Sequence, residues 1–274
     1  RRSFLAAAGL SVAALALTAC GGSASSVASS VASSAASSEA ASTSAAAGEL
    51  TTVEAGKLTM ATNAAFPPYE MTTDAGEFEG IDIETAQAIA DKLGLELQID
   101  DMDFDAALLS VQQGKADIVM AGVTVTDERK AVMDFSDSYA TGIQSIIVPE
   151  GSDIASPDDL AGKMIGTQRG TTGYIYCSDD FGDENVVAYD DGLTAVQALN
   201  NGQVDAVVID NAPAQEFVAA NPGLKILDTS YAEEDYAIGM AKNSPLEDAI
   251  NSTLEELKAD GTLQSIVDKY ITAE

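Results

Sequence analysis

The sequence SVQQGKADIVM at residues 110–120 returns about 88 residues later as ALNNGQVDAVV at residues 198–208. Each copy reads as the end of a helix, a glycine that stops it, an aspartate and an apolar strand. Two copies this far apart do not make a solenoid, whose repeats are shorter and more numerous. The pair therefore predicts two similar α/β lobes. The alternative is a chance likeness between two βα units, because such units share these patterns.

Strands and helices alternate around the first copy, which is typical of α/β sheets covered by helices. One helix is expected to begin at a cap at Asp82 and to end before Gly94. The other expected elements here are strands at 57–62, 95–99 and 118–121 and a short helix at 104–113. Near the end of the chain, Ser244 with proline and glutamate behind it predicts a capping box, and a last helix is expected from Thr262.

The ends of the repeated strands indicate where a ligand binds. In open α/β sheets, ligands lie beyond the carboxyl ends of the strands. The first strand runs out into Gly122 and Thr124, and the second runs out into Asp210. If two lobes face each other, these residues meet across one cleft. A chain end that returns to the first lobe requires two crossing segments, near 139–143 and 235–239.

Composition excludes several classes of partner. The 274 residues include 44 Asp and Glu against 13 Lys and Arg, with no histidine and no tryptophan. Nucleic acid is not an expected partner, since the chain has no basic stripe to replace counterions. A zinc site lacks ligands, and no metal or cofactor is expected. Cys177 lies in an apolar stretch, so we expect a buried, inert thiol.

Arginine is scarce, because the chain has only Arg129 and Arg169 beyond its first two residues. Arg129 closes AGVTVTDER at 121–129, and Arg169 opens RGTTG at 169–173. A guanidinium holds a planar carboxylate by two parallel hydrogen bonds, and threonine hydroxyls and loop amides satisfy its other lone pairs. These motifs predict a site for a small carboxylate ligand. The alternative is that each arginine pairs with a neighbouring acid on an acidic surface.

The amino-terminal segment 1–19 is expected to be a truncated lipoprotein signal peptide. Two arginines precede an apolar stretch that is shorter than the roughly 20 residues of a membrane span. The sequence LTAC at 17–20 resembles a lipobox, which implies acylation of Cys20 and a lipid anchor in the membrane. The alternative is a plain secretory signal with an incidental cysteine. The rest of segment 20–48 is almost entirely serine and alanine and is expected to be a disordered tether.

Eight short motifs follow one another through the remaining body. They are NAAFPPYE (63–70), GIDIE (80–84), FDAAL (104–108), GKAD (114–117), AGVTVTDER (121–129), DFSD (134–137), GTTG (170–173) and VDAVVID (204–210). Together they resemble the extracytoplasmic solute-binding proteins of polar amino-acid ABC transporters, family 3, which have the type II periplasmic-binding-protein fold. The resemblance implies two α/β lobes joined by a two-segment hinge. Lobe 1 would comprise 49–140 and 239–274, and lobe 2 would comprise 141–238.

The resemblance also implies roles for the charged residues and their neighbours. Arg129 would clamp the α-carboxylate of an amino acid, with Thr124 and the backbone around Thr171 and Thr172 as further donors. Asp210 would accept the α-ammonium, helped by the carbonyl oxygen of Gly122. The alternative for Asp210 is a helix cap, since aspartate is a good cap residue.

The resemblance further implies which residues surround the rest of the ligand. Phe66 and Phe104 would sandwich its aliphatic part, and the alternative is ordinary core packing. Asn63 and Gln168 would face its side chain, and because both are neutral they favour a neutral polar ligand. Arg169 would either reach an acidic side chain or lie outside the cleft.

The implied function is capture of a free amino acid, closure of the hinge and delivery to the permease of an ABC transporter. The protein is expected to be a monomer outside the cytoplasm, lipid-anchored to the cell membrane at its outer face or in the periplasm, and not an enzyme. One alternative is a dehydratase of cyclohexadienyl or arogenate type, for which Glu70 and Asp210 are the carboxylate candidates. Another is the ligand-sensing subunit of a receptor.

Overall fold

A five-stranded sheet holds the first part of the body in the computed structural model, which describes residues 50–271. The expected signal peptide, the lipidation site Cys20 and the tether lie outside the described residues. The strands, in the order β5-β1-β6-β14-β7, are β1 (Lys57–Thr62), β5 (Glu96–Asp101), β6 (Ile118–Val119), β7 (Met133–Phe135) and β14 (Gly239–Ala241). β1 runs parallel to β5 and β6, and β14 runs antiparallel to β6 and β7.

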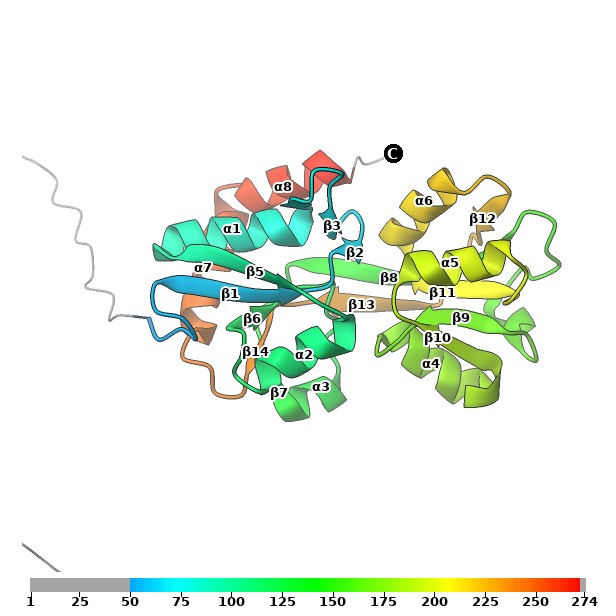
Figure 1. The fold of residues 1–274 in the computed structure, drawn as a ribbon, viewed down its shortest axis with the longest axis horizontal. Coiled ribbons are helices and arrows are strands. Elements are labelled where there is room, and N and C mark those ends of the chain that lie inside the picture. Colours follow the sequence, from blue (N-terminus) through cyan, green and yellow to red (C-terminus); the bar gives the residue numbers. More distant parts are fainter. Residues whose placement is uncertain (1–49, 272–274) are drawn as a thin grey trace, which may run out of the picture. The chain divides into compact units, whose positions relative to one another are not determined.

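Helices lie on both faces of this sheet (Figure 1). They are α1 (Ile81–Leu93), α2 (Phe104–Gln112), α3 (Asp127–Val132), α7 (Glu247–Ala259) and α8 (Thr262–Tyr270). A small antiparallel sheet is formed by β2 (Ala65–Phe66), β3 (Glu70–Thr72) and β4 (Phe78–Glu79). As the sequence predicts, α1 ends at Gly94, whose left-handed backbone (φ 71°) suits glycine.

A second sheet of six strands holds the middle of the chain. The strands are β8 (Ala140–Pro149), β9 (Ile165–Gln168), β10 (Val186–Tyr189), β11 (Ala206–Asp210), β12 (Leu224–Ile226) and β13 (Ala232–Tyr236). They are covered by α4 (Thr172–Phe181), α5 (Gly192–Asn200) and α6 (Asn211–Ala220), with short 3₁₀ turns at Pro157–Leu160 and Asp183–Asn185. Cys177 is buried in α4, as expected, and burial raises the pKa of its thiol to about 12.

The two copies of the sequence repeat occupy equivalent places in the two sheets. β6 lies parallel to β1, and β11 lies parallel to β9. In each copy the aspartate carboxylate accepts a hydrogen bond from the backbone of the neighbouring parallel strand. Asp117 accepts from Thr59 N in β1 at 2.8 Å, and Asp205 accepts from Met164 N, just before β9, at 2.8 Å. The equivalence favours a true repeat over the chance likeness of two βα units.

Two strands carry the chain between the sheets. β8 follows β7, β13 precedes β14, and β8 and β13 pair antiparallel with Ala140 opposite Tyr236. The largest hydrophobic cluster contains residues of both sheets, such as Met60 and Val207. The strands of the two sheets fall in the ranges predicted for the two lobes except at Ala140, the first residue of β8, and the boundaries of the lobes as domains stay a prediction.

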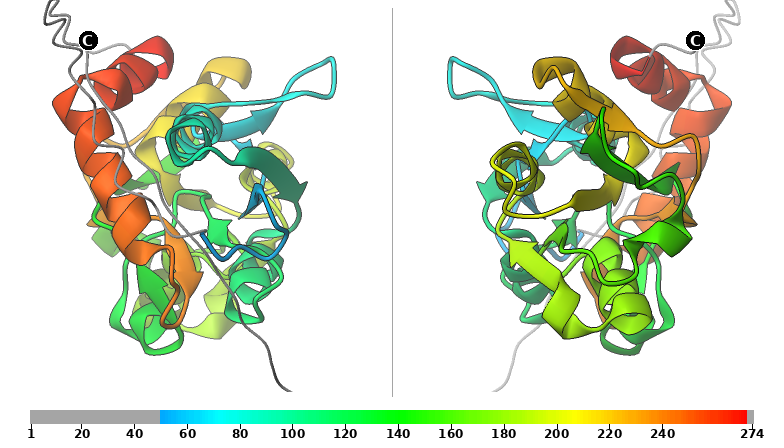
Figure 2. Two further views of the ribbon diagram at one scale, coloured as in Figure 1. Left: turned by 90° about the vertical axis from the view of Figure 1, so that its left-hand side faces the viewer. Right: turned by 90° about the vertical axis from the view of Figure 1, so that its right-hand side faces the viewer.

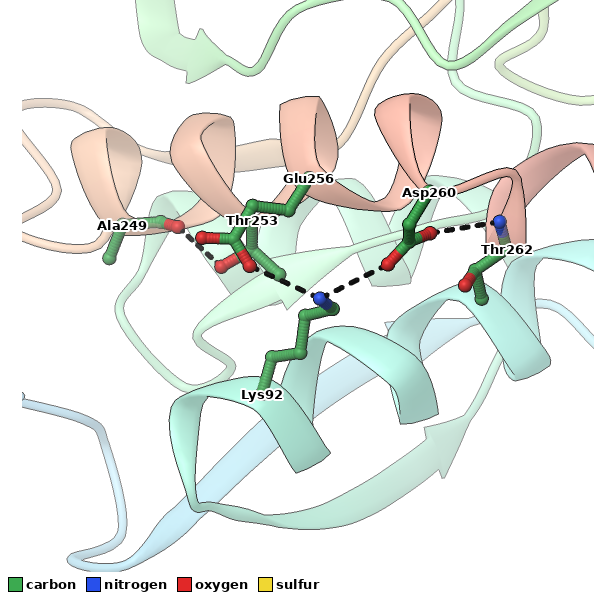
Figure 3. A network of polar contacts seen from close by, with 6 residues as sticks. All are labelled: Lys92, Ala249, Thr253, Glu256, Asp260 and Thr262. Carbon is green, nitrogen blue, oxygen red and sulfur yellow. Dashed lines mark hydrogen bonds and ion pairs between the residues drawn. The ribbon is translucent and has the colours of Figure 1, made fainter. Parts of the chain in front are cut away.

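The carboxyl-terminal helices return to the first sheet and pack against α1. Figure 3 shows Lys92 of α1 between Glu256 and Asp260, with Nζ to carboxylate distances of 3.1 and 3.3 Å. In both views of Figure 2, α7 (orange) and α8 (red) lie next to each other along one edge. Within residues 50–271 no helix has the length and apolar character to cross a membrane.

Two predicted helix caps are wrong. The helix expected from a cap at Asp82 begins at Ile81, with Gly80 as its N-cap, because the buried Asp82 carboxylate instead accepts hydrogen bonds from Gly122 N and Tyr139 OH. The capping box at Ser244 does not form either. The Ser244 hydroxyl accepts from Leu246 N at 3.3 Å within a turn, so α7 begins later, at Glu247.

Candidate functional site

One cavity collects the predicted site residues from both sheets. Its lining includes residues that follow β1 and β6, residues at and after the end of β9, and residues at the end of β11. All ten predicted residues line it: Asn63, Phe66, Phe104, Gly122, Thr124, Arg129, Gln168, Thr171, Thr172 and Asp210. The sequence pattern placed these residues at strand ends and helix starts, and the fold brings those ends together.

Arg129 is a buried cation in the lining of the cavity. It lies in the first turns of α3, which Thr126 caps by accepting a hydrogen bond from Arg129 N at 3.2 Å. Its Nη1 donates to Thr124 O at 2.8 Å, and its Nη2 donates to Gly170 O at 3.1 Å. The guanidinium also lies 5.4 Å from the ring centroid of Phe104. Burial lowers the Arg129 pKa, but an arginine stays charged at neutral pH.

Arg169 does not line the cavity. Its side chain is 53% exposed, and it contacts Asp190 with a nitrogen-to-oxygen distance of 3.5 Å. Pairing with a neighbouring acid on the surface was the alternative expected for both arginines, and it applies to Arg169 alone. The two threonine-rich motifs therefore present one guanidinium to the cavity and one to the surface.

Asp210 is a buried acid in the lining of the same cavity. It ends β11, and its carboxylate accepts from Gln144 Nε2 at 2.9 Å and from the Tyr236 hydroxyl. Burial raises the Asp210 pKa to about 7, and nearby Glu234 raises it too, while the hydrogen bonds oppose the shift. The helix-cap alternative is wrong for this side chain, because Asp210 occupies the N-cap position of α6 without a capping hydrogen bond.

Gly122 allows the chain to approach the aromatic wall of the cavity. Its backbone has φ +55°, and an added Cβ would lie 2.9 Å from Phe66 Cε1 and 3.3 Å from the ring of Tyr236. Its N–H donates to Asp82. Its carbonyl oxygen is therefore the backbone polar group that a ligand ammonium would use.

Three threonines lie between Arg129 and the start of α4. The Thr171 hydroxyl caps α4 by accepting from Tyr174 N at 3.2 Å, so its side chain is already engaged. The hydroxyls of Thr124 and Thr172 lie 3.4 Å apart and join the two sheets across the cavity. Because the first N–H groups of a helix have no intrahelical acceptor, the start of α4 can donate to an anion here.

The remaining predicted residues, two aromatic rings and two amides, complete the lining of the cavity. Phe66 and Phe104 line the cavity and also belong to the hydrophobic core, and their contact with the aliphatic part of a ligand stays a prediction. Gln168 Nε2 donates to Asn63 Oδ1 at 2.8 Å, and Asn63 Nδ2 donates to Met102 O at 3.0 Å. Two neutral amides thus bridge the cavity at the end where a ligand side chain is expected.

Four lining residues were not among the predicted site residues: Glu70, Gln144, Val208 and Ile209. Gln144 had a signal, as a lone buried amide within the apolar strand β8. Glu70 was weighed only as a catalytic carboxylate. It is fully buried beside Asp82, and the two carboxyls share a side-chain hydrogen bond, which requires a proton on one of them. Burial and the neighbouring Asp82 raise its pKa well above the ordinary value.

A cavity lined by a buried cation and a buried anion complements a small zwitterion. Donors around Arg129 suit a carboxylate, and acceptors around Asp210 suit an ammonium. Two sheets joined by two strands and closing on such a cavity define a two-lobed solute-binding protein.

The chain belongs to the bacterial extracellular solute-binding proteins, family 3, whose family model matches residues 58–273. It is similar to the L-cystine-binding protein TcyJ of Escherichia coli (strain K12), with 32% identity over 226 residues, 81% of this chain and 85% of that protein. It is also similar to the arginine-binding extracellular protein ArtP of Bacillus subtilis (strain 168), with 32% identity over 228 residues, 80% of this chain and 87% of that protein.

Solved structures agree with this family. An ancestral arginine-binding protein bound to arginine is 43% identical, with a TM-score of 0.75, and the match covers 79% of this chain and 98% of that one. The same kind of ancestral protein bound to glutamine is 42% identical, with a TM-score of 0.76 and coverage of 80% and 100%. The predicted α/β fold of two similar sheets, of the type II periplasmic-binding-protein kind, is confirmed.

Proposed function

We propose that this protein captures an amino acid in the cavity between its two sheets and delivers it to an ABC permease for import. The observation that carries the proposal is the placement of buried Arg129 and buried Asp210 in one cavity. An α-amino acid presents a carboxylate and an ammonium on one carbon, so the two charges of the ligand neutralise the two charges of the site. The cystine- and arginine-binding relatives support an amino acid as the ligand.

Closure of the two lobes is the proposed mechanism of capture. Polar contacts already span the two sheets at Thr124 with Thr172, at Asn63 with Gln168, and at Arg129 with the Gly170 carbonyl. Each sheet holds only part of the ligand's contacts, so a ligand stabilises the closed state more than the open one. The permease would then receive the ligand when the lobes separate.

We further propose a cationic side chain on the preferred amino acid. Glu70 brings a second buried acid to the cavity, where it shares a hydrogen bond with buried Asp82 and where no described cation acts on it. An uncompensated buried carboxyl stays protonated until a cation approaches, and a guanidinium or ammonium is such a cation. The relatives that bind arginine support this choice.

A neutral polar side chain is the second candidate. Asn63 and Gln168 are neutral amides at the end of the cavity, and an ancestral relative binds glutamine. Comparison of Glu70→Gln with Glu79→Gln separates the two candidates, because Glu79 is an exposed acid of β4. With a cationic ligand, Glu70→Gln is expected to weaken L-arginine binding by about thirty-fold or more and to leave L-glutamine binding nearly unchanged.

The same measurements test capture itself. A thermal-shift screen of residues 49–274 against the common amino acids is expected to give a stabilising ligand, since a ligand at a hundred times its dissociation constant adds about 2.7 kcal/mol. Calorimetry then gives the affinity. No stabilisation by any amino acid overturns the proposed function, whereas equal losses for arginine and glutamine in Glu70→Gln overturn only the choice of a cationic side chain.

We propose that the protein works as a monomer held outside the cytoplasm by acylated Cys20, at the outer face of the membrane or in the periplasm. The LTAC sequence at 17–20 and the serine- and alanine-rich segment behind it support an anchor and a spacer. The family is extracellular, which agrees with this placement. A spacer of this kind would let the body reach the permease while it stays near the membrane.

A further inference from the structure

Glu234 is a buried carboxylate in the strand that carries the chain back to the first sheet. It lies in β13 with a 6% exposed surface, while its neighbours Glu233 and Asp235 point to solvent. In the sequence AEEDY the three acids look like a solvated charge run, and only the pairing of β13 with β8 turns the middle one inward. Glu234 does not line the cavity.

The Glu234 carboxylate joins residues from both sides of the site. Its Oε2 accepts from Thr124 Oγ1 at 3.0 Å and from Gln144 Nε2 at 3.0 Å. Gln144 Nε2 also donates to Asp210 Oδ2 at 2.9 Å. A path of side-chain hydrogen bonds therefore runs from Thr124, whose carbonyl oxygen binds Arg129, through Glu234 and Gln144. It ends at Asp210, the carboxylate that would accept the ligand ammonium.

Glu234 also sets the electrostatics of that path. Its charge acts on buried Arg129 as the largest influence that opposes the lowering of the arginine's pKa by burial. It raises the Asp210 pKa in addition to the effect of burial. Glu234 thus stabilises the cation of the site and makes the anion harder to ionise.

We infer that Glu234 is a positioning residue for ligand capture, which holds Thr124 and Gln144 in place and acts as counter-charge to Arg129. The inference rests on the proposed function. A purely structural role in the β8–β13 pair would change stability alone. A positioning role also changes the affinity and the pH at which binding is lost, because both depend on charges that Glu234 faces.

The test is Glu234→Gln, which keeps the shape of the side chain and removes its charge. The matched control is Glu233→Gln, the exposed acid next to it on the same strand. The probes are L-arginine and L-glutamine, measured by calorimetry at a series of pH values. Glu234→Gln is expected to weaken binding of the better probe about tenfold to a hundredfold at pH ~8, as for a lost hydrogen bond to a charged group.

The pH profile gives the readout that a structural role does not move. Without the negative charge of Glu234, Asp210 ionises more easily, so the pH of half-maximal affinity is expected to move down relative to wild type and Glu233→Gln. Unchanged affinity and an unchanged midpoint in folded Glu234→Gln overturn the inference while capture stands. If the wild type binds neither these nor any other amino acid, the proposed function falls and the inference falls with it.

Circular dichroism checks whether Glu234→Gln folds. If it does not, a second variant tests the same inference. Gln144→Ala breaks the link between Glu234 and Asp210 and leaves both carboxylates in place. It is expected to weaken binding in the same direction, and the two substitutions together are expected to be non-additive because they interrupt one network. Wild-type affinity in Gln144→Ala, or strict additivity of the pair, speaks against the path.

Discussion

Replacement of Arg129 by alanine is expected to weaken amino-acid binding severely and to leave the fold intact. Arg129 is 9% exposed, and its guanidinium hydrogen-bonds two backbone carbonyl oxygens, of Thr124 and Gly170. The free protein loses two hydrogen bonds worth about 1 kcal/mol each and the counter-charge of buried Glu234, but it also loses the cost of a desolvated cation, so we expect a less stable protein that still folds. The bound state loses the partner of a buried carboxylate.

The expected loss of affinity follows from that unpaired carboxylate. Truncation of one side of a buried charge pair costs about 2–5 kcal/mol or more, which is roughly thirty-fold to several thousand-fold in the dissociation constant. Arg129→Lys is also expected to bind poorly, since an ammonium lacks the two-pronged geometry of a guanidinium. Calorimetry with each accepted amino acid measures the loss, and thermal unfolding of the ligand-free variants checks the fold.

Arg169→Ala is the matched control, because it removes the one other arginine of the body. Its pair with Asp190 is exposed on both sides, 53% and 73%, and such pairs contribute about 1 kcal/mol or less to stability. Binding is expected to be unaffected. If Arg169→Ala abolishes binding of all ligands and Arg129→Ala is tolerated, the assignment of the carboxylate clamp is wrong, and so is the orientation of the ligand.

Three further results are expected. Burial raises the pKa of Asp210 to about 7, and Asp210 must release its proton before it accepts an ammonium. Affinity is therefore expected to be full above pH ~7 and to fall by up to about tenfold per pH unit below it. Calorimetry at a series of pH values checks this, and an affinity independent of pH contradicts it. Gly122→Ala places a Cβ 2.9 Å from Phe66 Cε1, which is expected to cost about 1–3 kcal/mol of unfolding free energy and to weaken binding; a melting curve like that of the wild type would count against the tight approach. Cys20→Ser is expected to release the protein from membranes on fractionation, and labelled fatty acid still incorporated in the variant would reject this account of anchoring.

Local chemistry made much of the fold predictable. The repeat at 110–120 and 198–208 was legible because both copies keep the same spacing of a glycine that stops a helix, an aspartate and an apolar strand. Cap predictions failed where a distant group competed for the same side chain. The Asp82 carboxylate accepts from Gly122 and Tyr139, which are remote along the chain, and no local pattern contains them.

The sequence by itself determined the alternation of strands and helices, the equivalence of the two halves and the scarcity of arginine, because each depends on residue spacing or on composition. Only the tertiary structure decided which arginine enters the cavity, that Glu70 lies buried there beside Asp82, and that Glu234 rather than its neighbours turns inward. These outcomes depend on burial and on contacts between residues far apart in the chain, such as Thr124 with Glu234, 110 positions apart. The free energy of a charged group depends on its surroundings, and the fold supplies those surroundings.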